Sequence, residues 1–150
     1  MRIATVVEIK APVERVWPLI AEDRNIGLWM PDVLETTYPD GKPQGDPVGA
    51  RFEQRIRDGG RVGTYQGEVT AYAPQRLLGV RLQDQGNFAT DVVYRLSRQG
   101  DGTRLDYSCD VVLKSWLARI MMVIGLPMTR RIVKRHMQNL KRVAEAGGGV

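Results

Sequence analysis

The end of the chain, residues 114–145, constrains the fold most strongly. An almost wholly apolar stretch runs from Trp116 to Met128 and contains Pro127 near its end. Apolar residues continue on one face of a 3.6-residue period after this proline: Met128, Ile132, Val133, Met137, Leu140 and Ala144. A straight helix of this length would extend roughly 48 Å. It therefore needs a broad surface to pack against.

The preceding chain predicts a sheet that could supply this surface. Residues 2–10 alternate between apolar and polar side chains, as a half-buried strand does. Similar patterns, separated by short Gly-, Pro- and Asp-containing turns, predict further strands at 32–37, 48–57, 61–72, 76–83, 87–97 and 103–113. One face of these strands is apolar and the other is charged. This pattern is typical of an antiparallel sheet covered by helices on one side.

Two short helices are expected between the first two strands. Pro12 favours a helix start, because a missing N–H costs nothing at the first helical position, and Pro18 should kink or shorten this helix. A second helix is expected over 23–29, before Pro31. Residues 38–47 contain three prolines and two glycines and predict a loop.

Composition indicates one domain, residues 1–146, followed by a disordered tail at 147–150. The chain has 150 residues, 43% of them hydrophobic, and one cysteine, Cys109, which fits a reducing compartment. The N-terminal residues lack the pattern of a secretory leader, and the apolar stretch is too short to cross a bilayer. We therefore expect a soluble cytoplasmic protein.

Positive charge is concentrated in the last helix. Residues 114–150 carry a net charge of +7, whereas residues 1–113 carry −2. This indicates either an ordinary solvated helix face or weak contact with an anionic membrane surface. No nucleic acid partner is expected, because no aromatic residues alternate with the charges.

The order of elements resembles the helix-grip fold of the START-related superfamily, which includes pollen-allergen-like proteins and the polyketide cyclase/dehydrase family. The resemblance covers essentially the whole chain and is carried by residues 9–17 (IKAPVERVW), 29–33 (WMPDV), 67–69 (GEV) and 74–77 (PQRL). It implies an α+β protein in which a curved antiparallel sheet of six or seven strands wraps around a long C-terminal helix. It also implies a cavity between sheet and helix, which holds an apolar ligand in many relatives.

The sequence favours ligand binding over catalysis. The only histidine, His136, has no evident catalytic partner, and one histidine with one cysteine makes a metal site improbable. We therefore expect no catalytic residue, no metal and no cofactor. Candidate ligand-binding residues are polar residues on the predicted inner face and apolar residues at the start of the last helix: Gln54, Tyr65, Thr90, Tyr94, Tyr107, Trp116 and Met121.

These features leave three hypotheses. The first is a carrier of a hydrophobic small molecule or lipid. The second is a cofactor-free enzyme similar to polyketide cyclases, in which a tyrosine, glutamine or threonine polarises a carbonyl. The third is an interaction module, because the segment from Trp116 to Met128 is apolar all round and one sheet can cover only one stripe of it. The short helices, a ligand, a second subunit of a homodimer, or a membrane could cover the remainder.

Overall fold

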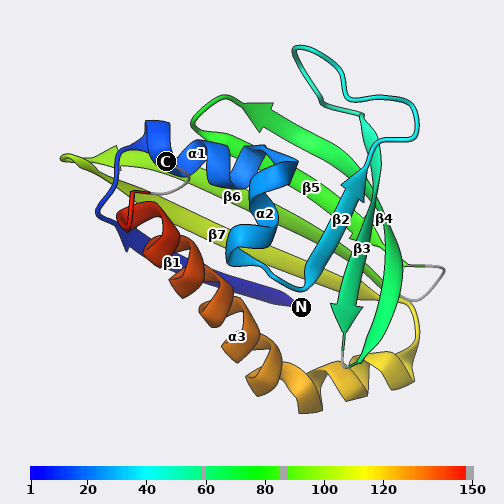
Figure 1. Ribbon diagram of the computed structural model, residues 1–150. Coiled ribbons are helices and arrows are strands. Elements are labelled where there is room, and N and C mark those ends of the chain that lie inside the picture. The colour runs from blue at the N-terminus through cyan, green and yellow to red at the C-terminus, as the bar shows by residue number, and fades with distance from the viewer. Residues whose placement is uncertain (59, 85–87, 148–150) are drawn as a thin grey trace.

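The computed structural model describes residues 1–150 except 59, 85–87 and 148–150, so most of the expected tail lies outside the described residues. A curved sheet forms one layer, and three helices cover its concave face (Figure 1). The elements in chain order are β1 (Arg2–Ile9), α1 (Val13–Ala21), α2 (Asp23–Trp29), β2 (Val33–Thr37), β3 (Arg51–Asp58), β4 (Arg61–Ala73), β5 (Leu77–Gln83), β6 (Phe88–Gln99), β7 (Gly102–Leu113) and α3 (Trp116–Glu145).

The seven strands form a single antiparallel sheet in the order β1-β7-β6-β5-β4-β3-β2. The connection from β1 to β2 carries α1 and α2. The helix-grip fold expected from the sequence is therefore confirmed. The predicted strand at 48–57 begins only at Arg51, because Gly49 has a φ of 89° and turns the chain.

Two bulges mark where the sheet departs from regular pairing. One lies on β2 between Val33 and Glu35, and the other on β4 between Val69 and Ala71. An extra residue on one strand bends that strand and increases its local twist. Gly79, which pairs with Ala71, leaves room for the second bulge, since a Cβ there would lie 2.9 Å from the Thr70 hydroxyl oxygen.

The two short helices pack against the sheet through their apolar side chains. The helix predicted to start at Pro12 begins one residue later, at Val13, with Pro12 as its N-cap residue, and Pro18 is accommodated within the helix. Trp29, at the end of α2, is almost fully buried, and its indole N–H donates to the Leu19 carbonyl at 2.8 Å. This bond satisfies the polar atom of the largest buried side chain and ties α2 to α1.

The two halves of α3 have different environments. Its C-terminal half buries Met137, Leu140 and Ala144 in the core. The Glu145 carboxylate accepts hydrogen bonds from the Lys10 backbone N–H (2.8 Å) and the Lys141 ammonium (2.6 Å), which fastens this end to the segment after β1. Near Pro127 the helix bends, and its first turns run along a different direction (Figure 1).

Candidate ligand-binding site

A cavity of about 360 Å³ lies between the concave face of the sheet and the helices α1 and α2. The sequence-based expectation placed it between the sheet and the C-terminal helix, and the structure corrects this. Among the described residues, none of α3 lines the cavity. The reason is that α3 packs mainly against β1 and α2, whereas α1, α2 and the loop 38–47 cover the middle of the sheet.

The cavity wall is mostly apolar. The helices contribute Ile20, Ala21, Asp23, Ile26, Trp29 and Met30, and the segment after them contributes Val33, Tyr38, Lys42, Pro43, Gly45 and Pro47. The sheet contributes Phe52, Gln54, Ile56, Val69, Tyr72, Leu78, Val80, Leu82, Thr90, Val92, Tyr94, Tyr107 and Cys109. An apolar wall with a few placed polar groups is the usual composition of a small-molecule site.

An aromatic cluster forms one part of this wall. The Tyr94 ring lies edge-on to Tyr107 and Trp29, with centroid distances of 5.3 Å and 6.2 Å. Burial raises the pKa of the Tyr94 hydroxyl, and burial together with the neighbouring Tyr94 raises the pKa of Tyr107. Both hydroxyls therefore remain protonated near neutral pH and act as hydrogen-bond donors.

The polar groups in the wall differ in their hydrogen-bond partners. Thr90 and Cys109 contact each other at 2.9 Å, and the Gln54 amide donates to the Thr36 hydroxyl at 3.2 Å. The Tyr94 hydroxyl has no hydrogen-bond partner among the described residues. Every fully buried side-chain oxygen of these residues has a partner, so the Tyr94 oxygen is not fully buried. The Tyr94 oxygen therefore faces the open volume of the cavity. A ligand acceptor or a water molecule could pair with it.

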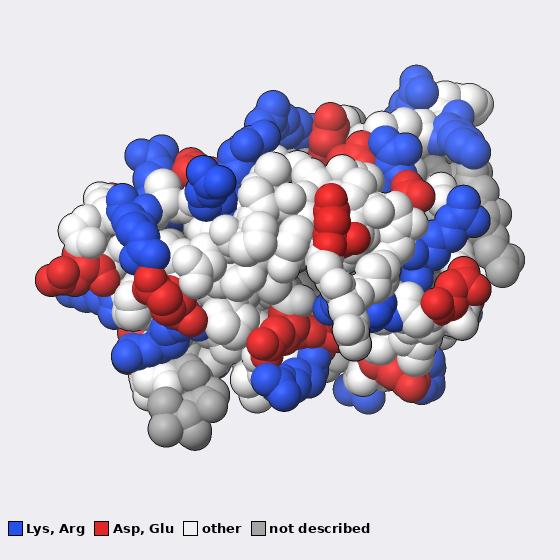
Figure 2. All heavy atoms as spheres, turned by 90° about the horizontal axis from the view of Figure 1, so that it is seen from above, with Lys and Arg blue, Asp and Glu red and all other residues white. Residues whose placement is uncertain are grey.

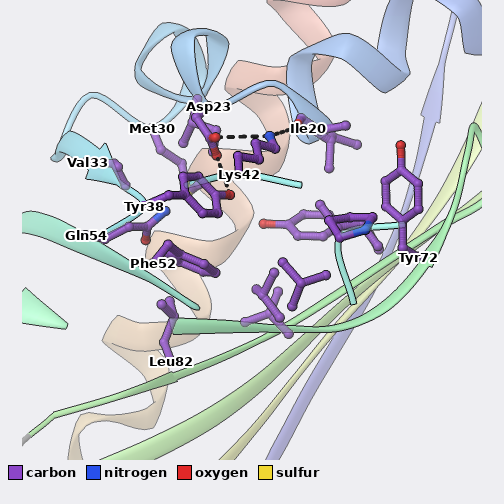
Figure 3. Close-up of a pocket in the computed structure, with 18 of the residues that line it drawn as sticks. Ile20, Asp23, Met30, Val33, Tyr38, Lys42, Phe52, Gln54, Tyr72 and Leu82 are labelled. Carbon is purple, nitrogen blue, oxygen red and sulfur yellow. Dashed lines mark hydrogen bonds and ion pairs between the residues drawn. The ribbon is translucent and has the colours of Figure 1, made fainter. Parts of the chain in front are cut away.

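One end of the cavity is closed by polar contacts with the loop 38–47 (Figure 3). The Lys42 ammonium lies 3.1 Å from the Asp23 carboxylate and 5.3 Å from the centre of the Tyr38 ring. The Tyr38 hydroxyl donates to Asp23 at 3.4 Å, and its ring packs on Phe52. Burial and the Asp23 charge raise the pKa of Tyr38. These contacts join the loop to the start of α2.

Four of the seven candidate residues predicted from the sequence come together in this wall: Gln54, Thr90, Tyr94 and Tyr107. The other three do not. Tyr65 packs against Phe88 with ring centroids 6.3 Å apart, outside the described cavity wall. Trp116 and Met121 lie on the outer side of α3 and are 71% and 62% exposed. They are displaced because α3 does not cover the cavity.

Sequence reasoning missed Tyr72 and the loop residues. Regular alternation along β4 places Val69 and Tyr72 on opposite faces, but the bulge at Thr70 shifts the phase, so both line the cavity. The ring of Tyr72 packs against Trp17 at 5.8 Å. For Tyr38 and Lys42, the available signal was the presence of an aromatic residue and a lysine in a loop rich in proline.

His136 lies outside this wall. It is half-buried on α3, and burial lowers its pKa despite the nearby Asp32 carboxylate. Within the part of the chain that the structure describes, no helix is both long and apolar enough to cross a membrane.

The architecture is shared with solved structures of low sequence identity. The protein TTHA0849 from Thermus thermophilus superposes with a TM-score of 0.76 at 15% identity, over 98% of this chain and 99% of that one. A START superfamily protein from Mycobacterium smegmatis gives 0.70 at 18%, over 97% and 94%. The di-domain ARO/CYC StfQ from the steffimycin biosynthetic pathway gives 0.75 at 12%, over 97% of this chain and 50% of that one. At these identities the similarity establishes the fold alone.

Comparisons of the amino-acid sequence with curated proteins and with family models gave two results. No curated protein matches the sequence. A family model described as "Polyketide cyclase / dehydrase and lipid transport" matches residues 1–145, which is nearly the entire chain.

Proposed function

This chain belongs to the polyketide cyclase/dehydrase and lipid transport family, and from that premise we propose that it binds a hydrophobic small molecule or lipid. The binding site is the cavity beneath α1, α2 and the loop 38–47. The observation that carries this proposal is the apolar volume of about 360 Å³ that the Tyr94 hydroxyl faces. Its size is at the lower end of the range of about 300–1,000 Å³ typical of small-molecule sites.

The chemistry of the wall defines the ligand class. Aliphatic and aromatic side chains favour an apolar body. The neutral Tyr94 hydroxyl favours a carbonyl, carboxyl or hydroxyl oxygen that accepts a hydrogen bond. The Gln54 amide, held by Thr36, offers a second polar group on the β3 side. We therefore propose an apolar molecule with at least one oxygen acceptor.

Calorimetric titration with such compounds tests the proposal. A suitable panel contains medium-chain fatty acids, flavonoids and polycyclic aromatic ketones. We predict that Tyr94→Phe weakens binding of the best ligand about three- to tenfold, because a single neutral hydrogen bond is lost. Tyr65→Phe, outside the described wall, is the matched control and should leave affinity unchanged. Equal affinity of wild type and Tyr94→Phe would contradict the role of Tyr94, and absence of binding across the panel would contradict the proposal.

A cyclase-like activity is the second candidate, favoured by the two tyrosines, Tyr94 and Tyr107, whose rings are in contact in the cavity wall. Neutral donors in a dry cavity could polarise a ketone of a flexible polyketone and hold it in position. Binding remains our first proposal because Asp23, the only carboxylate among the described wall residues, is already paired with Lys42. Turnover of a polyketone that disappears in both Tyr94→Phe and Tyr107→Phe would favour the enzyme instead.

A further inference from the structure

The first half of α3 presents an uncovered apolar surface. Its outer face is formed by seven exposed side chains, Trp116, Leu117, Ile120, Met121, Val123, Ile124 and Met128. Their spacing places them on one side of the helix. Met122 and Val133 lie on the other side and pack against the core. The partly buried Met122, and not the exposed side chains, therefore holds this part of α3 against the core.

The chain from residue 114 to residue 135, which includes this half of α3 and its flanks, is strongly basic and contains no acid. Residues 114–135 carry six cations, Lys114, Arg119, Arg130, Arg131, Lys134 and Arg135. All six are exposed, and none lies within 4.0 Å of a carboxylate among the described residues. On the face drawn in Figure 2, by contrast, Lys and Arg are interspersed with Asp and Glu. The outer face of α3 therefore combines apolar side chains with uncompensated positive charge.

We propose that the outer face of α3 docks the protein on the surface of an anionic phospholipid bilayer. The apolar side chains would enter the boundary between headgroups and acyl chains, while the flanking cations meet lipid phosphates. Trp116, at the first turn, is the residue type that prefers this boundary. The helix would lie in the interface, since no described helix is long and apolar enough to span the membrane.

Charge selects the bilayer over a second copy of the chain. A two-fold interface places the same patch on both subunits, so a face that carries cations and no acid would meet a second face of the same charge. Like charges brought together without counter-charges oppose such a contact. A bilayer containing anionic lipid supplies both the apolar layer and the negative charge.

Co-sedimentation with vesicles tests the docking. Full-length protein is mixed with vesicles of phosphatidylcholine alone or of phosphatidylcholine with phosphatidylglycerol. Binding is expected only to the anionic vesicles and should weaken as salt is raised. Combined Leu117→Ser, Ile120→Ser and Ile124→Ser should weaken it by more than about tenfold, because apolar area is lost. Combined Arg130→Gln, Arg131→Gln and Lys134→Gln should weaken it by about tenfold or more.

The matched control replaces three exposed valines of the sheet, Val6, Val62 and Val112, by serine. This variant should bind vesicles as the wild type does. Equal binding of wild type and both α3 variants would overturn the proposal. The proposal would also be overturned if the wild type did not bind vesicles but formed a concentration-dependent dimer that the serine substitutions in α3 abolish. The outer face would then join two copies of the chain. No substituted residue lines the cavity, so ligand affinity should stay unchanged, and failure of docking is distinguishable from failure of ligand binding.

Discussion

Thr103 and Tyr94 illustrate two roles for a buried hydroxyl. Thr103 is 1% exposed, and its hydroxyl donates to the Ala11 carbonyl at 2.7 Å, joining β7 to the segment between β1 and α1. The Tyr94 hydroxyl has no such partner among the described residues. A buried bond of the first kind stabilises the fold, whereas an open hydroxyl in a cavity wall stays available to a ligand.

Replacing Thr103 by valine keeps the shape of the side chain but leaves the Ala11 carbonyl buried without this donor. We predict a loss of about 1–3 kcal/mol in the free energy of unfolding, the usual cost of an unsatisfied buried polar group. Urea denaturation measures it as a lower midpoint with an unchanged slope. Thr64→Val, at an exposed position of β4, is the control. Equal stability of Thr103→Val and wild type would contradict the structural role of this bond.

His136 makes stability depend on pH. Burial on α3 lowers its pKa below about 6.5, its usual value, with Arg135 also lowering it and Asp32 opposing the shift. The unfolded chain therefore binds this proton more readily than the folded chain, so stability falls as the pH drops through about 6.5. We predict that His136→Gln loses less stability than wild type between about pH 7.5 and 5.5 in denaturant titrations. A steeper loss in the variant would be the opposite of this expectation.

The sequence places side chains on the correct face of the sheet where alternation is regular, while their role in ligand binding stays a prediction. Four candidate residues lie where side chains alternate regularly between the two faces of the sheet, and all four line the cavity: Gln54, Thr90, Tyr94 and Tyr107. Tyr72 was missed because a bulge changes the phase of β4, and bulge positions are not specified by a period of two. The Lys42–Asp23 contact joins a loop to a helix 19 residues apart in sequence, which no local pattern could indicate.

At the scale of elements, α3 is the most informative. Its length, its basic second half and its bend at Pro127 were all predicted from residue spacing. The elements that α3 packs against were not predicted. Residue spacing defines which side of a helix is apolar, but it does not define which element packs against that side. The structure buries Leu140 completely, whereas Ile124 is 70% exposed.

This asymmetry predicts unequal effects of the same kind of truncation within one helix. Leu140→Ala should lower the free energy of unfolding by about 2–5 kcal/mol, as large-to-small core substitutions do. Ile124→Ala should change it by less than about 0.5 kcal/mol, because little packing is lost at an exposed site. Thermal and chemical denaturation of both variants provide the measurement. Similar losses at the two positions would mean that the first half of α3 is packed as tightly as the second.

For the whole molecule, the sequence predicted six or seven strands, of which the structure has seven, together with the order of elements and the family. It did not predict how the cavity is covered. That depends on how α1, α2 and the loop 38–47 fold back over the middle of the sheet, and these long-range contacts have no local signature. The structure separates two surfaces, an apolar cavity beneath the short helices and an apolar and basic outer face on α3. Ligand binding is what we propose for the first, and membrane docking for the second.

Native mass spectrometry of the protein purified from its own source, followed by denaturing extraction, tests the ligand-binding assignment most directly. Wild type is compared with Val80→Phe and Leu78→Phe, two substitutions that fill the described cavity from β5. We predict a retained apolar molecule in the wild type that is lost in whichever filled variant folds normally by thermal denaturation. A wild type that carries no molecule, or a filled and folded variant that retains it, would contradict the account.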